Sequence, residues 1–352
     1  MPADLWTEAG HMMESGLLVA MGAVPLGLLA WAARPDGEPL LPRWTPWRVP
    51  WSGFEVVTAF LVVSFVLPAA ALEVLTQSAF YGTIYGADFP PPGAKDVSPD
   101  RAKDASIVRM LWANLVALPF TLGLIWAAAR TLYPTWKPKP VASTAGRVKL
   151  AVVAWLVLAP TVLVFNAVVN AVALMFDVTP DAHALTKFAG HPALDQVLFA
   201  LEACVAAPVR EEIVFRGVLL SWCVGRMKLP GAGVTRVTGT RPWFVMLTAV
   251  AFAAVLSDWR PAPVAFAGSL AVGLAVVGRY ARTGARRIRA VYATAALFAV
   301  VHTSVWPSPV PLFLLGLGLG WLAVRTKGVL VPVLVHGLFN AVSAVFVLRG
   351  GG

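Results

Sequence analysis

The sequence predicts an all-α, polytopic transmembrane helix bundle with about ten membrane spans. Of its 352 residues, 58% are hydrophobic and only 13% are charged, whereas a soluble domain usually carries about 25% charged residues. The mean hydropathy is +0.74, and the chain contains repeated apolar runs close to the about 20 residues that a bilayer core requires. These values exclude a soluble or disordered protein. Cys204 and Cys223 both lie in apolar runs, which excludes a disulfide scaffold.

Ten apolar segments are long enough to be membrane spans. In order they are 15–33, 53–75, 107–129, 150–176, 194–225, 243–259, 261–278, 290–304, 309–324 and 329–348. The fifth is too long for one straight crossing. Because proline interrupts helical hydrogen bonding, we expect Pro208 to divide it into an interfacial start and a spanning remainder.

The basic residues between these segments predict the topology. With the N-terminus outside and ten crossings, 19 of the 28 Lys and Arg residues fall in inner segments, 6 in outer segments and 3 within spans. This bias follows the positive-inside rule and places both chain ends outside. The net charge of +10 therefore reflects topology, because the basic residues are dispersed in short clusters, and no nucleic-acid partner is expected.

A helix pair is predicted to be duplicated. With a shift of 46 residues, Phe252 aligns with Phe298, Pro261 with Pro307, and Arg279 with Arg325. The alternative is a chance likeness between two hairpins rich in Ala and Val. At this offset His302 aligns with Leu256, so only the second copy has an ionisable residue there.

Ionisable residues inside spans are costly and mark functional sites by default. Here they are Glu202, Arg210, Glu211, Glu212 and Arg216 in the fifth span, His302 in the eighth, and His336, with the polar Asn340, in the tenth. Glu212 and Arg216 have the i, i+4 spacing of a helical ion pair, which leaves Glu211 to face a cavity. His336 and Asn340 share one helix face. The alternative is a purely structural set of ion pairs and interhelical hydrogen bonds, with Arg210 pairing Glu211.

These groups have the chemistry of peptide hydrolysis, which requires a base to activate water and donors for the oxyanion. Glu211 is the candidate base, and His302 is expected to orient the water or to protonate the leaving amine. His336 and Asn340 are candidate oxyanion donors, with Glu212 and Arg216 in supporting positions. We expect no cofactor and no metal, although a zinc site formed by Glu211, His302 and His336 remains an alternative.

Three motifs occur in order: Glu211-Glu212-x-x-x-Arg216, Phe298-x-x-x-His302 and His336-x-x-x-Asn340. They resemble the motifs of the CPBP family, the CAAX protease and bacteriocin-processing intramembrane peptidases, which includes the type II CAAX prenyl endopeptidases. The resemblance implies a glutamic-type endopeptidase. In that family the first Glu and the second-motif His activate water, and the third-motif His and Asn stabilise the oxyanion, which agrees with the roles above.

The resemblance covers residues 194–348, which we expect to form a catalytic membrane domain after an N-terminal region of four spans at 1–193. The 91-residue gap from Glu211 to His302 is longer than the family leads us to expect. An extra helix pair at about 243–280 explains it, with Phe252-x-x-x-Leu256 as a degenerate second motif.

The sequence thus predicts a multi-pass integral membrane endopeptidase, whose partners are the lipid bilayer and a membrane-associated peptide or protein. A prenylated CAAX substrate follows from the resemblance alone. The alternative from a different class is a non-catalytic membrane protein, such as an immunity factor, a scaffold or a transporter.

Overall fold

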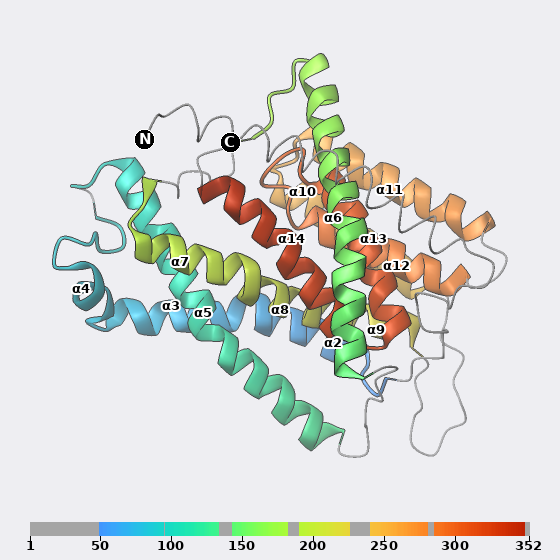
Figure 1. Ribbon diagram of the computed structural model, residues 1–352, viewed down its shortest axis with the longest axis horizontal. Coiled ribbons are helices and arrows are strands. Elements are labelled where there is room, and N and C mark those ends of the chain that lie inside the picture. The colour runs from blue at the N-terminus through green and yellow to red at the C-terminus, as the bar shows by residue number, and fades with distance from the viewer. Residues whose placement is uncertain are drawn as a thin grey trace, which may run out of the picture. The chain divides into compact units, whose positions relative to one another are not determined.

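The computed structural model describes residues 49–94, 96–133, 143–181, 190–225, 240–280 and 285–348, and these residues form helices and connecting turns without β-strands (Figure 1). The helices are α2 (Gly53–Leu61), α3 (Leu67–Gln77), α4 (Phe80–Tyr85), α5 (Pro99–Leu132), α6 (Thr144–Met175), α7 (Ala193–Leu201), α8 (Ala207–Glu212), α9 (Ser221–Val224), α10 (Arg241–Leu256), α11 (Pro261–Tyr280), α12 (Ala285–Val300), α13 (Pro309–Thr326) and α14 (Leu330–Leu348). Three π-helical segments, η1 (Val62–Val66), η3 (Glu202–Ala206) and η4 (Ile213–Leu220), join neighbouring helices.

The predicted all-α membrane fold is confirmed. Nine of the ten predicted spans coincide with helices or continuous helical runs, and the first, 15–33, lies outside the described residues. Five helices are long and apolar enough to cross a bilayer: Gly53–Gln77, Pro99–Leu132, Thr144–Met175, Pro261–Arg279 and Pro309–Thr326. Arg241–Leu256 and Leu330–Val345 are shorter apolar helices, so the helices are compatible with about ten spans.

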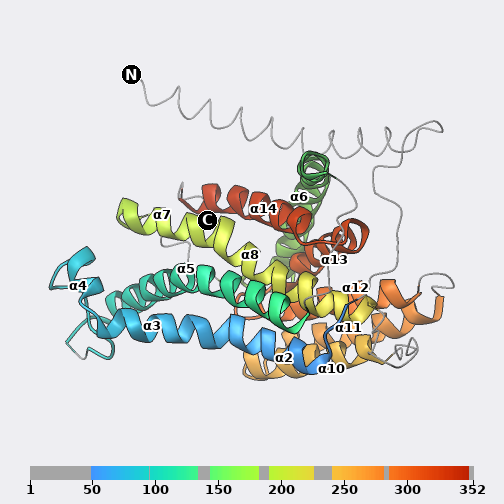
Figure 2. The ribbon, with the colours of Figure 1, turned by 90° about the horizontal axis from the view of Figure 1, so that it is seen from below.

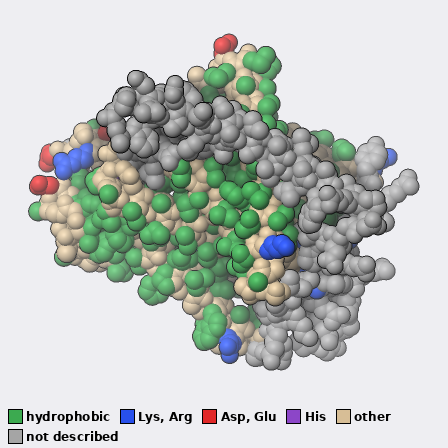
Figure 3. Space-filling model, in the orientation of Figure 1, with side chains coloured by type: hydrophobic (Ala, Val, Ile, Leu, Met, Phe, Trp, Pro, Cys, Tyr) green, Lys and Arg blue, Asp and Glu red, His purple; other side chains and the backbone are tan. Residues whose placement is uncertain are grey.

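Large apolar side chains point outward from these helices, as expected of surfaces in contact with lipid. Phe54, Trp126 and Met175 are 79%, 62% and 81% exposed. Figure 3 shows hydrophobic side chains over most of the described surface on the face it presents, with few charged ones.

The chain divides into two compact units. The first unit comprises residues 1–45, 140–182 and 238–335, and the second comprises 46–139, 183–237 and 336–352. In the first unit, α12 contacts α10, α11 and α13, and α13 contacts α6. The buried face of α12 is rich in alanine, with Ala290, Ala293, Ala296 and Ala299 inaccessible to solvent. Small side chains of this kind let neighbouring helices approach closely.

In the second unit, α5 contacts α3, α7, η3 and α8, and Figure 2 shows α3 and α5 side by side. The fifth predicted span is a helical run from Ala193 to Val224. It does not divide at Pro208, contrary to the expectation from sequence. Instead the π-helical segment η3 precedes the proline, and the Ala207 N–H donates to the Glu202 carbonyl, five residues back. The π turn accommodates the missing proline N–H without ending the helix.

Candidate functional site

The centre of the candidate site is a buried ion pair on the long helical run of the second unit. Arg216 Nη1 donates to Glu212 Oε1 over 2.7 Å, and the two side chains are 1% and 0% exposed. The pair that the i, i+4 spacing predicts is therefore present. Arg210 does not pair with Glu211. It binds Glu202 at 2.5 Å and donates to the Asn114 carbonyl of α5 at 3.2 Å, so the alternative in which Arg210 pairs with Glu211 is wrong.

His336 of α14 lies between the two adjacent glutamates. Its Nδ1 is 3.0 Å from Glu212 Oε1, and its Nε2 is 4.0 Å from Glu211 Oε2. A carboxylate paired with arginine only accepts hydrogen bonds, so the Nδ1 proton donates to Glu212. Glu212 thus keeps a proton on Nδ1 and sets the orientation of the imidazole ring, and Nε2 faces Glu211.

Glu211 differs from its neighbour in exposure and partners. Its side chain is 27% exposed, whereas Glu212 is fully buried. Within the described part of the chain, the Oε2 atoms of both Glu211 and Glu212 are buried without a hydrogen-bond partner, but only Glu212 is paired with arginine through its other oxygen. A carboxylate oxygen in this position can accept a proton from a bound molecule, as a general base must.

Asn340 lies one turn after His336 on α14. Its Nδ2 donates to the Ala203 carbonyl at 2.8 Å. That carbonyl has no partner in its own helix, because the Ala207 N–H bonds to Glu202 instead and Pro208, the next residue in the π register, has no N–H. Asn340 therefore satisfies a backbone acceptor. Its amide nitrogen carries two N–H groups, so this contact uses only one donor.

Gly337 allows α14 to approach this part of the helical run. A Cβ at Gly337 would lie 2.5 Å from the Cys204 carbonyl oxygen, a contact that the backbone cannot accommodate. His336, Gly337 and Asn340 thus form one face of α14 against the segment that precedes Pro208. The sequence shows the His336–Asn340 spacing but does not indicate why glycine stands between them.

His302 belongs to the first unit, in the turn that follows α12. Its Nδ1 lies 2.7 Å from the Phe298 carbonyl oxygen, and its ring is 5.1 Å from the Phe298 ring, centroid to centroid. The structure therefore brings Glu211, Glu212, Arg216, His336 and Asn340 together within one unit. The approach of His302 to these residues stays a prediction.

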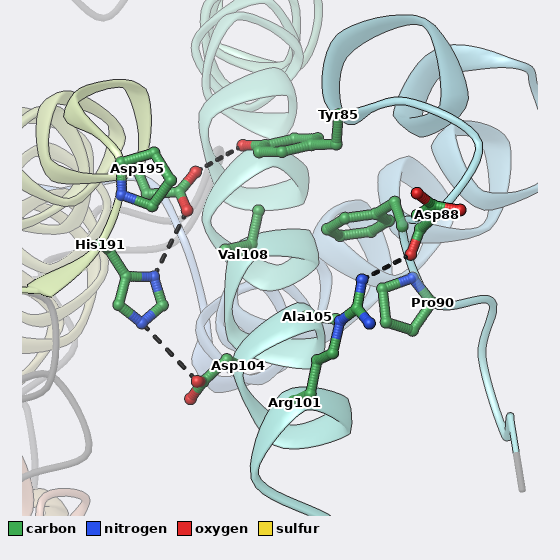
Figure 4. Close-up of a pocket in the computed structure, with 11 residues that line it drawn as sticks. Tyr85, Asp88, Pro90, Arg101, Asp104, Ala105, Val108, His191 and Asp195 are labelled. Carbon is green, nitrogen blue, oxygen red and sulfur yellow. Dashed lines mark hydrogen bonds and ion pairs between the residues drawn. The ribbon is translucent and has the colours of Figure 1, made fainter. Parts of the chain in front are cut away.

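The sequence gives no signal for a second polar cluster in the second unit. This cluster consists of Tyr85, Asp104, His191 and Asp195. It lines a cavity of about 280 Å³ together with Phe89, Arg101 and Val108 (Figure 4). His191 lies between Asp195, at 3.4 Å from Nδ1, and Asp104, at 3.7 Å from Nε2. The Tyr85 hydroxyl donates to Asp195 over 2.7 Å. Burial, and then this hydrogen bond to a carboxylate, raise the pKa of Tyr85.

The alternative of a zinc site concerns Glu211, His302 and His336. Among the described residues, no three His, Cys, Asp or Glu side chains are grouped so that they could hold a metal ion. Cys204 and Cys223 are free thiols.

The chain matches the family model described as type II CAAX prenyl endopeptidase Rce1-like. The match has two parts, residues 193–286 and 276–342. Residues 193–342 are therefore similar to this family. The Rce1-like region contains all three motifs and almost coincides with the segment where the motifs predict the family. This match and the apolar helices identify the chain as a multi-pass integral membrane protein. No curated protein and no solved structure matches it.

Proposed function

We propose that this chain is a glutamic-type intramembrane endopeptidase, in which Glu211 activates water and His336 with Asn340 stabilises the oxyanion. The observation that carries the proposal is the position of His336, whose two ring nitrogens face Glu212 and Glu211. A structural ion pair requires only Glu212 and Arg216. The additional carboxylate and imidazole supply the base and the donor that peptide hydrolysis requires.

In the proposed reaction, a water bound to Glu211 Oε2 attacks the carbonyl carbon of the scissile peptide. Glu211 takes the water proton, and the carbonyl π electrons move to oxygen. The oxyanion accepts hydrogen bonds from His336 Nε2 in the imidazolium form and from the second N–H of Asn340. When the C–N bond breaks, the nitrogen receives the proton from Glu211 directly or through His302. A carboxylic acid and a free amine result.

Glu212 and Arg216 are positioning residues in this scheme. Glu212 Oε1 receives both Arg216 Nη1 and His336 Nδ1. A ring with both nitrogens hydrogen-bonded or in ionic contact has little rotational freedom, which keeps Nε2 directed at Glu211. Restricting a catalytic group in this way contributes to the rate through orientation.

We propose a membrane-associated peptide ending in a prenylated CAAX sequence as the substrate class, which rests on the family match alone.

We also propose that residues 194–348 form the catalytic domain, since the matched region contains every proposed site residue. Two overlapping matched segments support the extra helix pair at about 243–280, since a duplication would let the family model align twice.

The test compares Glu211→Gln with the wild-type protein, purified in detergent, on a fluorescent farnesylated peptide ending in CAAX. We expect cleavage to fall at least about 100-fold, because general-base catalysis typically contributes 10²–10⁴-fold. The thermal unfolding midpoint should stay unchanged.

Full activity of Glu211→Gln would contradict the proposal. A folded wild-type protein that cleaves neither this peptide nor its unprenylated form would favour a non-catalytic function. Loss of wild-type cleavage on chelation would favour the metal-dependent alternative.

A further inference from the structure

The turn between α12 and α13 carries His302, and it is not part of either helix. Its backbone is held by short-range hydrogen bonds, among them His302 N–H to Ala299 O at 3.0 Å and Val305 N–H to His302 O at 3.3 Å. The His302 ring is fixed on one side by the Phe298 carbonyl. The direction of the other ring nitrogen therefore depends on how the turn itself is held.

Two charged residues from distant parts of the first unit bind the backbone of this turn. Asp181, which follows α6, accepts the Trp306 N–H at Oδ2 over 3.0 Å, and its own N–H donates to the Trp306 carbonyl over 2.8 Å. Arg260 donates through Nη2 to the Thr303 carbonyl and through Nη1 to Asp181 Oδ2, both over 3.1 Å. Together these four bonds join three separate segments at the residues that follow His302.

Arg260 comes from the turn of the predicted extra helix pair, between α10 and α11. Asp258 and Trp259 have φ angles of 49° and 61°, and a left-handed conformation is unfavourable for a bulky residue such as tryptophan. The turn is closed by Trp259 N–H to Ala254 O at 2.8 Å and Arg260 N–H to Ser257 O at 3.0 Å. Unfavourable backbone of this kind persists where surrounding contacts hold it, and here it directs Arg260 at Thr303.

We propose that Asp181 and Arg260 are positioning residues for His302. The inference rests on the proposed function for the role of His302, and its contacts all lie within the first unit. The side chains of Asp181 and Arg260 are 39% and 46% exposed, and an exposed ion pair adds little stability. The two residues therefore act through their bonds to the backbone of the turn.

The test uses Arg260→Ala and Asp181→Ala, with Arg279→Ala as the matched control from the same helix pair. Arg279 is exposed on α11. On the farnesylated CAAX peptide we expect kcat to fall about 10- to 100-fold in the first two variants, since small misplacements of a catalytic group have effects of this size. KM and the thermal unfolding midpoint should stay close to wild type. Hydrogen exchange should accelerate in residues 301–308. Arg279→Ala should match wild type in all four measurements.

A charge-reversed pair, Asp181→Arg with Arg260→Asp, separates this role from a simple ion pair. Reversal restores an attraction between the two side chains, but it presents an acceptor to the Thr303 carbonyl and a donor to the Trp306 N–H. We expect kcat to stay low. Recovery of wild-type kcat would overturn the proposal, because an ion pair alone would then be sufficient.

His302→Ala distinguishes failure of the inference from failure of the proposed function. If His302→Ala is inactive while Arg260→Ala and Asp181→Ala have wild-type kcat, the positioning role is wrong and the proposed function stands. If His302→Ala is fully active, His302 has no catalytic role, and both the inference and that part of the proposed mechanism are overturned.

Discussion

At the scale of single residues, Glu212 has two partners at one oxygen atom. Its Oε1 binds Arg216 and His336, and the side chain is completely buried. Removing one member of a buried pair leaves an uncompensated charge, whereas replacing both by apolar residues of similar size is often tolerated. This asymmetry allows the structural and the catalytic contributions of Glu212 to be measured separately.

We predict that Glu212→Gln lowers the free energy of unfolding by about 3–5 kcal/mol, the usual cost of breaking a buried ion pair. The double substitution Glu212→Met with Arg216→Met should recover most of this stability. It should stay inactive, because His336 Nδ1 then has no acceptor. Denaturation in detergent and peptide cleavage measure the two effects. Glu211→Gln serves as the control and should not be destabilised. An active double variant would show that Glu212 does not position His336.

Tyr85 provides a second residue-scale prediction, which concerns pH. Its pKa in the folded protein is raised by burial and by the bond to Asp195, whereas an unfolded tyrosine titrates near pH 10. Because the folded state favours the neutral phenol, the stabilisation is complete below about pH 10 and is lost as the pH rises further. We expect the wild-type unfolding midpoint to fall more between pH 9 and pH 11 than that of Tyr85→Phe. Parallel pH profiles of the two proteins would contradict this expectation.

At the scale of elements, two π-helical segments precede prolines in the second unit. The segment η1 ends just before Pro68 and η3 just before Pro208, while Pro119 and Pro160 lie inside the continuous helices α5 and α6. Near Pro208 the π register directs the Ala207 N–H to the Glu202 carbonyl. The Ala203 carbonyl accepts a hydrogen bond from Asn340 instead. The backbone of one helix therefore determines where a side chain of another is held.

Close packing of α14 against this segment can be tested at Gly337. We predict that Gly337→Ala displaces α14, because its Cβ would meet the Cys204 carbonyl oxygen at 2.5 Å, and that peptide cleavage falls with the shift of His336. The control is Gly123→Ala in α5, where a Cβ meets nothing within 4 Å. Alanine has the higher helix propensity, so this variant should be at least as stable as wild type. Thermal unfolding and cleavage assays check both variants. Wild-type behaviour of Gly337→Ala would disprove the close approach.

At the scale of the whole molecule, the distribution of basic residues determines the expected orientation in the membrane. With ten crossings and both ends outside, the segment around Asp96 is external and the segment around Lys137 is internal. His302, in the turn that follows α12, then lies on the outer side. A CAAX-type cleavage requires access from the cytosolic side, so the orientation of the chain bears directly on the substrate.

The orientation can be measured by labelling single cysteines in intact cells. In a background with Cys204 and Cys223 replaced by alanine, a membrane-impermeant maleimide should label Asp96→Cys and should not label Lys137→Cys until the membrane is permeabilised. If only Lys137→Cys is labelled in intact cells, the chain has the opposite orientation, and His302 lies on the inner side of the membrane.

The sequence by itself determined the features that depend on composition and short spacing. Apolar runs of span length predicted nine of the helical runs that the structure describes, and the i, i+4 spacing predicted the pair of Glu212 with Arg216. Both are local, because the period of the helix decides which neighbours meet. The three ordered motifs likewise indicated the family.

Only the tertiary structure decided which distant groups meet. His336 is 124 residues from Glu212, Asn340 is 137 residues from Ala203, and Arg260 reaches Asp181 across 79 residues. Such contacts depend on how close two helices approach, as at Gly337, and on which backbone carbonyls a proline leaves unpaired. No helical or strand period encodes those distances, because they result from the packing of whole helices.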